Sequence, residues 1–461
     1  MGFYQLSTSN NIFGGLRFPE WIYLTFILVL IVGGCSSDGN NGESFILYTP
    51  SISTETYLFD GSYNVAYQWS SELFAGQSAF LQEDGSIIRA GSINNIVPEN
   101  RFVKAYSDAN NATFQIGGIV ERISKDGDVV WTFEYFSDDF APHHVATVIP
   151  NGNLLMPVWR YYTEEESIAL GRNPQRLTSG GLWIDSIIEV RPTGSSGGEI
   201  VWEWNAADHL IQDFDPTKAN FGNLEENLGR IDINYGSGLT IPEDFMHVNS
   251  AFYIEELDQI VFTSFHYSEL WVIDHSTTTQ EAAGSTGGRY GRGGELLYRW
   301  GNPWVYGRDD ADVFLLSAVH DPKWIAEDRQ FIMYDNNISD PTRGLEGGSS
   351  MVVKIEPPIL PDGSYELETD GIYGPARPVL AADLGVQATS VGTAQRLLDG
   401  RTLSCDCPNS LAIWLDADGT VTETEDLFEA AMVDSDNEQV FRLVGYPKDY
   451  EGVRSLQNSD E

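Results

Sequence analysis

The sequence predicts an all-β protein that folds as a β-propeller with long loops between its strands. Three observations support this prediction: short apolar runs bounded by turn-forming residues, a hairpin motif that recurs along the chain, and little helical periodicity. The chain has 461 residues with 45 Gly and 20 Pro, and 12% of its residues are aromatic. A regular all-β assembly can reach this length as a single domain. A protein of two β-sandwich domains is the alternative.

The first 35 residues have the pattern of a lipoprotein signal peptide. An apolar run from Trp21 to Val32 precedes Gly33-Gly-Cys35-Ser36, which is similar to a bacterial lipobox. The run has about 12 residues, whereas roughly 20 are needed to span a bilayer. We therefore predict that residues 1–35 are a signal peptide ending at Cys35, which becomes the lipidated N-terminus. An ordinary signal anchor is the alternative.

Ser36 follows the predicted lipidation site and favours sorting to the outer membrane. We therefore expect a lipid-anchored protein of the bacterial cell envelope, on the periplasmic side of the outer membrane. Residues 36–45 are mostly Gly, Asn, Ser and Asp, which is typical of a flexible tether. The predicted propeller domain extends over residues 46–455.

Five hairpin motifs mark successive units of the predicted propeller. Each consists of a strand, a tight turn of the Asp/Asn-Gly type and an apolar strand, which is the usual pattern of a β-hairpin. The turns contain Asp84-Gly85, Asn151-Gly152, Asp258, Asp328 and Asp399-Gly400. A strand unit that repeats along the chain without a helical layer is typical of a propeller. Residues 165–171 and 425–432 are candidates for short helices.

The net charge of the chain is −42, from 26 basic and 68 acidic residues. Such a surface repels polyanions, so the charge argues against nucleic-acid binding. The acidic residues are distributed along the whole chain, which favours a solvated surface over an acidic tail. An acidic protein that handles an anionic substrate must build local positive potential. Its few buried cationic or hydrogen-bond-donating residues are therefore informative.

Three of the seven histidines occupy related positions in the repeats. His144 lies seven residues before Asn151, and His320 lies seven residues before Glu327. His247 lies just before the hairpin of a third unit. The first strand of each propeller blade starts at the mouth of the central channel, so we predict that these three imidazoles converge there.

Other polar residues near these motifs have simpler interpretations. If His247 and Asn249 belong to one regular strand, their side chains share a face, because residues two apart do so. Imidazoles are common metal ligands, but a metal site would need a carboxylate or tighter spacing, so no metal is predicted. His143 and His275 are interpreted as structural.

Cys405 and Cys407, two residues apart on one predicted strand, are poorly placed for an unstrained disulfide. They are not accompanied by a second cysteine pair that would complete a metal site. No function is assigned to them.

Several short sequence motifs together resemble those of one known family. They are His143-His144 with Pro150-Asn-Gly-Asn-Leu, Asp244 to His247-Val-Asn249-Ser, Val319-His320-Asp321, Trp202 to His209, Asp274 to Thr279, and Tyr298 to Pro303. In this combination the chain is similar to the bacterial, nucleotide-independent aryl-sulfate sulfotransferases of the arylsulfotransferase family. The resemblance extends from about Gly76 to Tyr450 and implies a six-bladed propeller.

The family resemblance also implies an activity and roles for particular residues. The activity is ping-pong transfer of a sulfuryl group from a phenolic sulfate ester to a phenol acceptor, with no cofactor. His320 corresponds to the nucleophile, and a neutral imidazole can attack sulfur near pH 7. His144, His247 and Asn249 correspond to the groups that donate to the sulfuryl oxygens or exchange protons. Asp321 is expected to point away from His320.

One position departs from the family pattern. Where the family has an arginine, this chain has Phe265, although an arginine fork is the strongest single donor to a sulfate group. Arg160, His209 and His266 are candidate substrate-binding replacements. His266 would face the opposite side of a regular strand and would need a β-bulge to take this role.

Phe265 keeps a second functional interpretation open. The chain could be a non-catalytic envelope lipoprotein whose propeller binds a sulfated or aromatic ligand, or a partner protein. A quinoprotein dehydrogenase is a third possibility, but the vicinal cysteine pair and calcium-ligand cluster expected of such a propeller are not evident.

Overall fold

The computed structural model describes residues 44–109, 111, 113–177, 180–235, 241–368, 371–431 and 439–457. All of them belong to one structural unit, residues 41–461. The predicted signal peptide, Cys35 and residues 36–43 of the predicted tether lie outside the described residues. The tether was expected to reach residue 45, but Ser44 already begins a strand whose residues are all buried.

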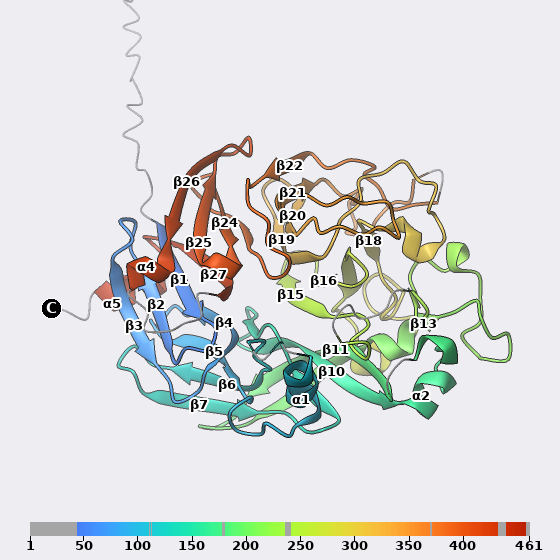
Figure 1. The fold of residues 1–461 in the computed structure, drawn as a ribbon, viewed down its shortest axis with the longest axis horizontal. Helices are drawn as coiled ribbons and strands as arrows, with labels where there is room; N and C mark the ends of the chain where they lie inside the picture. The colour runs from blue at the N-terminus through green and yellow to red at the C-terminus, as the bar shows by residue number, and fades with distance from the viewer. Residues whose placement is uncertain are drawn as a thin grey trace, which may run out of the picture. The chain divides into compact units, whose positions relative to one another are not determined.

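Six antiparallel sheets form the blades of a β-propeller, as predicted (Figure 1). The first blade contains β27 (Val440–Pro447), β1 (Ser44–Pro50), β2 (Glu55–Phe59) and β3 (Val65–Ser70). The second contains β4 (Ala75–Leu81), β5 (Ile87–Ser92), β6 (Gly118–Ile123) and β7 (Val129–Glu134). The third contains β8 (Phe140–Pro142), β9 (Thr147–Val148), β10 (Leu154–Thr163), β11 (Gly181–Pro192) and β12 (Gly198–Asn205).

The other three blades follow in chain order. The fourth contains β15 (Val248–Ile254), β16 (Gln259–Ser264), β17 (Glu269–Asp274) and β18 (Tyr298–Trp300). The fifth contains β19 (Val319–Ile325), β20 (Gln330–Asp335), β21 (Met351–Ile355) and β22 (Leu380–Asp383). The sixth contains β23 (Ala394–Arg396), β24 (Thr402–Asp406), β25 (Leu411–Leu415) and β26 (Val421–Asp426). Each blade contacts the next around a ring, the second and third blades through a bridge between Thr132 and Ser196.

The two ends of the described chain close this ring. The C-terminal strand β27 pairs with the first strand β1, with Phe45 opposite Tyr446 and Leu47 opposite Val444. The first blade therefore takes its innermost strand from the end of the sequence. β27 also contacts β4 of the second blade and β24 of the sixth, so this strand holds three blades together.

Short helices and one small sheet lie in the loops. The helices are α1 (Arg101–Asp108), α2 (Glu164–Ala169), α3 (Thr279–Ala282), α4 (Leu427–Ala431), α5 (Glu451–Gln457) and the 3₁₀ turns η1 (Pro174–Arg176), η2 (Ala206–His209), η3 (Leu224–Glu226), η4 (Pro303–Tyr306) and η5 (Cys407–Asn409). Strands β13 (Leu210–Ile211) and β14 (Ile231–Asp232) pair in parallel. α2 and α4 confirm the two expected helices. Among the described residues, every helix is too short or too polar to cross a membrane.

The predicted hairpin turns form for a local physical reason. Asp84, Asn151 and Asp399 each accept a hydrogen bond from the backbone N–H two residues later. Gly152, in the second turn, has φ +84°, a left-handed conformation that glycine adopts without steric cost. In the fourth-blade turn Asp258 itself takes the left-handed conformation, with φ +52°, which aspartate tolerates better than most residues.

Irregularities in the innermost strands interrupt the alternation of side chains. The register of β15 shifts between Val248 and Ser250, and that of β19 shifts between His320 and Lys323. A third shift lies near the start of β27, between Val440 and Leu443, opposite Pro50 and Tyr48 of β1. A β-bulge leaves one residue unpaired and changes the direction of nearby side chains. These bulges lie beside the residues of the candidate site.

The loop between β5 and β6 carries α1 to the histidine cluster. Asn100 caps the helix by accepting from the N–H of Phe102, and this satisfies one of the free donors of the first turn. Phe102 and Tyr106 are buried against Trp159 and Trp183. The packing of this apolar face holds Tyr106 near the start of the fourth blade.

Candidate active site

The structure brings together the three histidines that occupy equivalent positions in the repeats. The rings of His144 and His247 have centroids 4.6 Å apart. The ring of Phe265 lies 5.4 Å from that of His320 and 5.5 Å from that of His247. Phe441 lies 5.2 Å from His144 and 6.2 Å from His320. The third, fourth and fifth blades therefore each contribute one histidine to a single cluster.

His320 is buried and held through one ring nitrogen. Its Nδ1 lies 2.6 Å from Oδ1 of Asn336 and 3.1 Å from the carbonyl oxygen of Ala318. The amide nitrogen of Asn336 donates to the carbonyl oxygens of Ala388 and Val391, at 2.8 and 2.9 Å. The Asn336 oxygen must therefore face the imidazole.

This arrangement assigns the tautomer of His320. Both neighbours of Nδ1 are acceptors, so Nδ1 carries the proton and Nε2 has the lone pair. Burial is the main cause that lowers the pKa of His320 to about 3, and the charges of His247 and Arg442 add to this effect. At neutral pH the ring is uncharged, with Nε2 available as a nucleophile.

His144 is positioned by a second histidine. Its Nδ1 lies 2.6 Å from Nδ1 of His143, and Nε2 of His143 lies 2.9 Å from Oδ1 of Asp185. The His143 ring also stacks on Trp159, with centroids 4.0 Å apart. Burial, first among the causes, lowers the pKa of both histidines. His143, interpreted as structural from the sequence, thus orients a residue of the cluster.

His247 is the histidine of the cluster that a carboxylate orients directly. Its Nδ1 lies 2.5 Å from Oδ2 of Asp244, and the Tyr106 hydroxyl donates to the same oxygen at 2.9 Å. Burial by itself would raise the pKa of Asp244, but the charge of His247 and its hydrogen bond outweigh burial and lower it. Asp244 is therefore an ionised partner for Nδ1, and Nε2 is left for a ligand.

Asn249 does not share a face with His247, contrary to the sequence-based expectation. His247 precedes β15 and has φ +54°, and Asn249 is the unpaired residue of the β15 bulge. The Asn249 amide donates to the Val319 carbonyl at 2.8 Å and accepts from the Thr263 hydroxyl at 2.6 Å. Its side chain therefore ties the fourth blade to the strand that carries His320.

The departure from the family pattern lies in the cluster itself. β16 ends at Ser264, so Phe265 and His266 lie in a turn. His266 therefore needs no β-bulge to reach the side of Phe265. The N–H groups of Phe265 and His266 donate to the carbonyls of His247 and Met246. The rings of both residues consequently approach His247, with His266 at 5.4 Å.

His266 belongs to the one group of described residues that could hold a metal ion. Asp244, His247 and His266 each place a ligand atom within 4.8 Å of the others. Within the described part of the chain, Nδ1 of His266 is buried without a hydrogen-bond partner. Burial, followed by the charge of His247, lowers the pKa of His266 to about 3. The sequence had suggested no metal because Asp244 was not recognised as part of this set.

Two other substrate-binding candidates are engaged elsewhere. Arg160 pairs with Glu203 at 2.6 Å and donates to Ser186. His209 stacks on Trp204 and contacts the Ala282 carbonyl at 2.7 Å. The structure therefore does not bring Arg160 or His209 to the histidine cluster.

The remaining singled-out residues lie in structural roles. His275 lies between Glu189 and Asp258, at 2.9 and 3.0 Å, and joins the third and fourth blades. Cys405 and Cys407 form a disulfide with Cα atoms 5.0 Å apart, which corrects the expectation from a regular strand. β24 ends at Asp406 and Cys407 begins η5, so the chain turns and brings the second sulfur back.

Three phenylalanines surround the histidines. Phe114 follows α1 and lies 5.2 Å from His144 and 6.0 Å from His247, and Phe265 and Phe441 lie against the same imidazoles. Phe114 and Asn336 were missed from the sequence. Asn336 could have been found as a polar residue that directly follows the buried strand β20.

A family model described as "Arylsulfotransferase (ASST)" matches residues 127–344. This match supports the resemblance to the arylsulfotransferase family. The matched range contains His144, His247, Asn249 and His320, and it supports an arylsulfotransferase-type function. Phe441 lies outside it. A comparison with curated proteins finds no match.

Solved structures similar to this chain share little sequence with it. A protein of unknown function from Bacteroides caccae is 11% identical with a TM-score of 0.46, and 87% of this chain and 98% of that one are covered. The periplasmic gluconolactonase PpgL of Pseudomonas aeruginosa is 10% identical with a TM-score of 0.42 and the same coverage. Apo AztD from Citrobacter koseri is 9% identical with a TM-score of 0.37, covering 88% and 97%. These distant likenesses say nothing about activity.

Proposed function

We propose that this protein is an aryl-sulfate sulfotransferase that works through a sulfo-histidine at His320. The observation that carries the proposal is Nε2 of His320, which has no hydrogen-bond partner among the described residues. The ring is neutral and lies in a cluster with His144 and His247. The family match over residues 127–344 supports the same class of reaction. The donor is a phenolic sulfate ester, and the acceptor is a phenol.

The first half-reaction transfers the sulfuryl group to the protein. Nε2 of His320 forms the N–S bond while the bond from sulfur to the phenolic oxygen breaks. The electron pair stays on that oxygen, and His247, in its protonated form beside Asp244, gives it a proton. The acceptors at Nδ1, Asn336 and Ala318, stabilise the positive charge that develops on the His320 ring.

The second half-reaction returns His320 to its starting state. The acceptor phenol gives its proton to His247 while its oxygen attacks sulfur. The N–S bond breaks, and its electron pair returns to Nε2 of His320. The same group therefore acts as acid in one half-reaction and base in the other, as a ping-pong route requires.

The aromatic side chains of the cluster suit an aryl substrate. Phe114, Phe265 and Phe441 present rings around the imidazoles, and aromatic rings pack favourably against one another. A substrate ring held in this way would place its sulfate ester against the histidines. The phenyl ring of Phe265 would contribute apolar contact where an arginine would contribute charge.

A steady-state assay tests the proposed reaction. The full chain in detergent is mixed with 4-nitrophenyl sulfate, with and without phenol, and release of 4-nitrophenol is followed. We expect release that depends on phenol and is abolished in His320→Asn. His275→Asn is the matched control. It removes a histidine that joins the third and fourth blades and does not belong to the cluster. Absence of release from folded protein with several donors would favour the alternative of a propeller that binds such ligands without turnover.

We also propose that Cys35 is lipidated and anchors the protein in the cell envelope, on the periplasmic side of the outer membrane. The support is the apolar run from Trp21 to Val32 followed by Gly-Gly-Cys35-Ser36. Incorporation of a labelled fatty acid into the protein, but not into Cys35→Ala, is the expected result. Equal labelling of both proteins would contradict it.

A further inference from the structure

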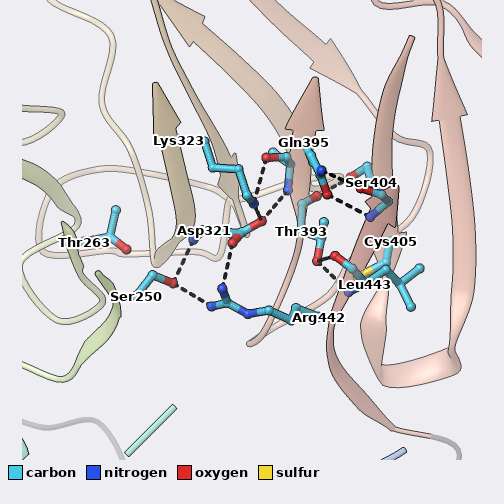
Figure 2. Close-up of polar contacts among 12 residues, drawn as sticks. Ser250, Thr263, Asp321, Lys323, Thr393, Gln395, Ser404, Cys405, Arg442 and Leu443 are labelled. Atoms are coloured by element: carbon cyan, nitrogen blue, oxygen red, sulfur yellow. Dashed lines mark hydrogen bonds and ion pairs between the residues drawn. The ribbon is translucent and has the colours of Figure 1, made fainter. Parts of the chain in front are cut away.

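A buried arginine lies beside the histidine cluster, outside the range that matches the family. Arg442 is in β27, at the bulge where the first blade closes the ring, and is 3% exposed. Its Nη1 lies 3.2 Å from Oδ1 of Asp321, and its Nη2 donates to the Ser250 hydroxyl at 3.0 Å. Figure 2 shows the guanidinium pointing toward Ser250 and Asp321.

The charges around Arg442 do not balance. Asp321, which is fully buried, is shared by Arg442 and Lys323 and accepts from the N–H of Ala394 at 3.0 Å (Figure 2). Two cations thus meet one carboxylate. In a chain with a net charge of −42, this is local positive potential of the kind that an anionic substrate requires.

The guanidinium also has donors that the described residues leave unused. Nε of Arg442 is buried and has no hydrogen-bond partner among the described residues, and the ion pair between Nη1 and Asp321 is not aligned as a hydrogen bond. A buried donor without an acceptor is unfavourable, and native proteins rarely tolerate it. A buried N–H donor of a charged guanidinium is suited to an oxygen of an anion, because such charge-assisted hydrogen bonds are strong.

Phe441 lies between Arg442 and the imidazoles of the cluster. The guanidinium carbon lies 5.0 Å from the centroid of the Phe441 ring, and that ring contacts His144 and His320. The charge of Arg442 is among the causes that lower the pKa of both histidines, after burial. The positive charge therefore acts on the nitrogen that would receive the sulfuryl group.

We propose that Arg442 is a sulfate-binding residue that supplies the positive charge which position 265, a phenylalanine, cannot supply. The inference rests on the proposed function, because the ligand is the anionic sulfate ester of an aryl compound. Asp321 and Ser250 hold the guanidinium in place. Arg442 donates to the sulfuryl oxygens, and its charge stabilises the sulfuryl group as it moves from the phenolic oxygen to His320.

Binding measured without turnover tests this role. In a His320→Asn background, calorimetry measures the affinity for 4-nitrophenyl sulfate and for the uncharged 4-nitrophenyl methyl ether. Adding Arg442→Gln should weaken binding of the sulfate ester by about tenfold or more and leave the ether unchanged. Adding Arg89→Gln, which removes a buried arginine paired with Glu121 in the second blade, should change neither affinity. Equal affinity for the sulfate ester with and without Arg442 would overturn the proposal.

The kinetic readout separates this proposal from the proposed function. With His320 present, Arg442→Gln should lower kcat by about a hundredfold, and Arg442→Lys should recover part of it. Sulfate-ester binding that depends on Arg442 in a protein without turnover would support the binding role and contradict the enzyme. Turnover that is unaffected by Arg442→Gln would contradict the binding role and support the enzyme.

A structure of the complex decides the matter if Arg442→Gln does not fold. A crystal of His320→Asn soaked with 4-nitrophenyl sulfate should show a sulfuryl oxygen within hydrogen-bond distance of Nε or Nη1 of Arg442. A sulfuryl group held by the histidines, with the guanidinium out of reach, would overturn the proposal.

Discussion

His320 and His275 are both largely buried histidines near blade junctions, but their surroundings are opposite. His275 has a carboxylate at each ring nitrogen, Glu189 and Asp258. His320 has two neutral acceptors at Nδ1 and a free Nε2. Burial would lower the pKa of His275, but its two carboxylates outweigh burial and raise it, whereas burial lowers that of His320 to about 3. Partners, not burial alone, decide the direction in which the pKa of each histidine moves.

The largest expected difference between the two histidines is in activity. His320→Asn removes the proposed nucleophile and should lower kcat/KM by about 10⁴-fold or more. His275→Asn removes an ion-pair partner far from the reacting atoms and should leave kcat/KM within about threefold. Initial rates with 4-nitrophenyl sulfate and phenol measure both. Comparable losses of kcat/KM in the two variants would show that the residues hydrogen-bonded to a histidine do not determine whether it takes part in the reaction.

Asn336 allows the partner of His320 to be changed directly. Replacing its amide with a carboxylate gives His320 the kind of partner that His275 has. Asn336→Asp places a carboxylate at Nδ1 of His320, so the pKa of His320 should rise. Activity requires neutral His320 and is lost as pH falls through its pKa, so the acidic limb of the kcat/KM profile should move from near pH 3 toward neutral pH. At pH 6 the variant should then be about tenfold slower.

A surface asparagine provides the control for this change. Asn223 caps η3 with its side-chain oxygen, and aspartate caps a helix equally well. Asn223→Asp should therefore leave the pH profile in place. An unchanged acidic limb in Asn336→Asp would contradict the role of Asn336 as the orienting partner of His320.

The smallest expected effect is on stability as a function of pH. The pKa of His275 is raised in the folded state, so its stabilising contribution is complete below its unfolded pKa and is lost as pH rises through the folded value. Each unit of pKa difference corresponds to about 1.4 kcal/mol. Denaturant unfolding at several pH values from 5 to 9 measures the free energy of unfolding. The wild type should exceed His275→Gln in this free energy by the largest amount at the acid end. An advantage that grows with pH would reverse the assigned sign.

The sequence was sufficient to predict the fold because its signals are local. Hairpin turns with Asp or Asn recur in five of the six blades, and Asn151-Gly152 forms the tight hairpin that this dipeptide favours. The positions of His144, His247 and His320 relative to those turns were enough to predict that their rings converge. The boundary at residue 45 was misplaced because pairing of β1 with β27 depends on residues at the far end of the chain.

The parts of the site that the sequence did not predict depend on irregular backbone and long-range contacts. The bulge in β15 turns Asn249 away from His247, and an assumed regular strand cannot show this. The end of β16 at Ser264 likewise brings His266 beside His247. Asn336 and Arg442 reach the cluster from other strands, and only the folded ring shows their neighbours.

The most direct test of the central claim is to trap the covalent intermediate. The protein is mixed with 4-nitrophenyl sulfate alone, quenched at neutral to basic pH and digested. The masses of its peptides are then measured by mass spectrometry. The account predicts one added sulfuryl group, roughly 80 Da, on the peptide that contains His320, and its disappearance when phenol is added before the quench. Turnover accompanied by an adduct on another residue, or by none, would contradict the assignment of His320 as the nucleophile.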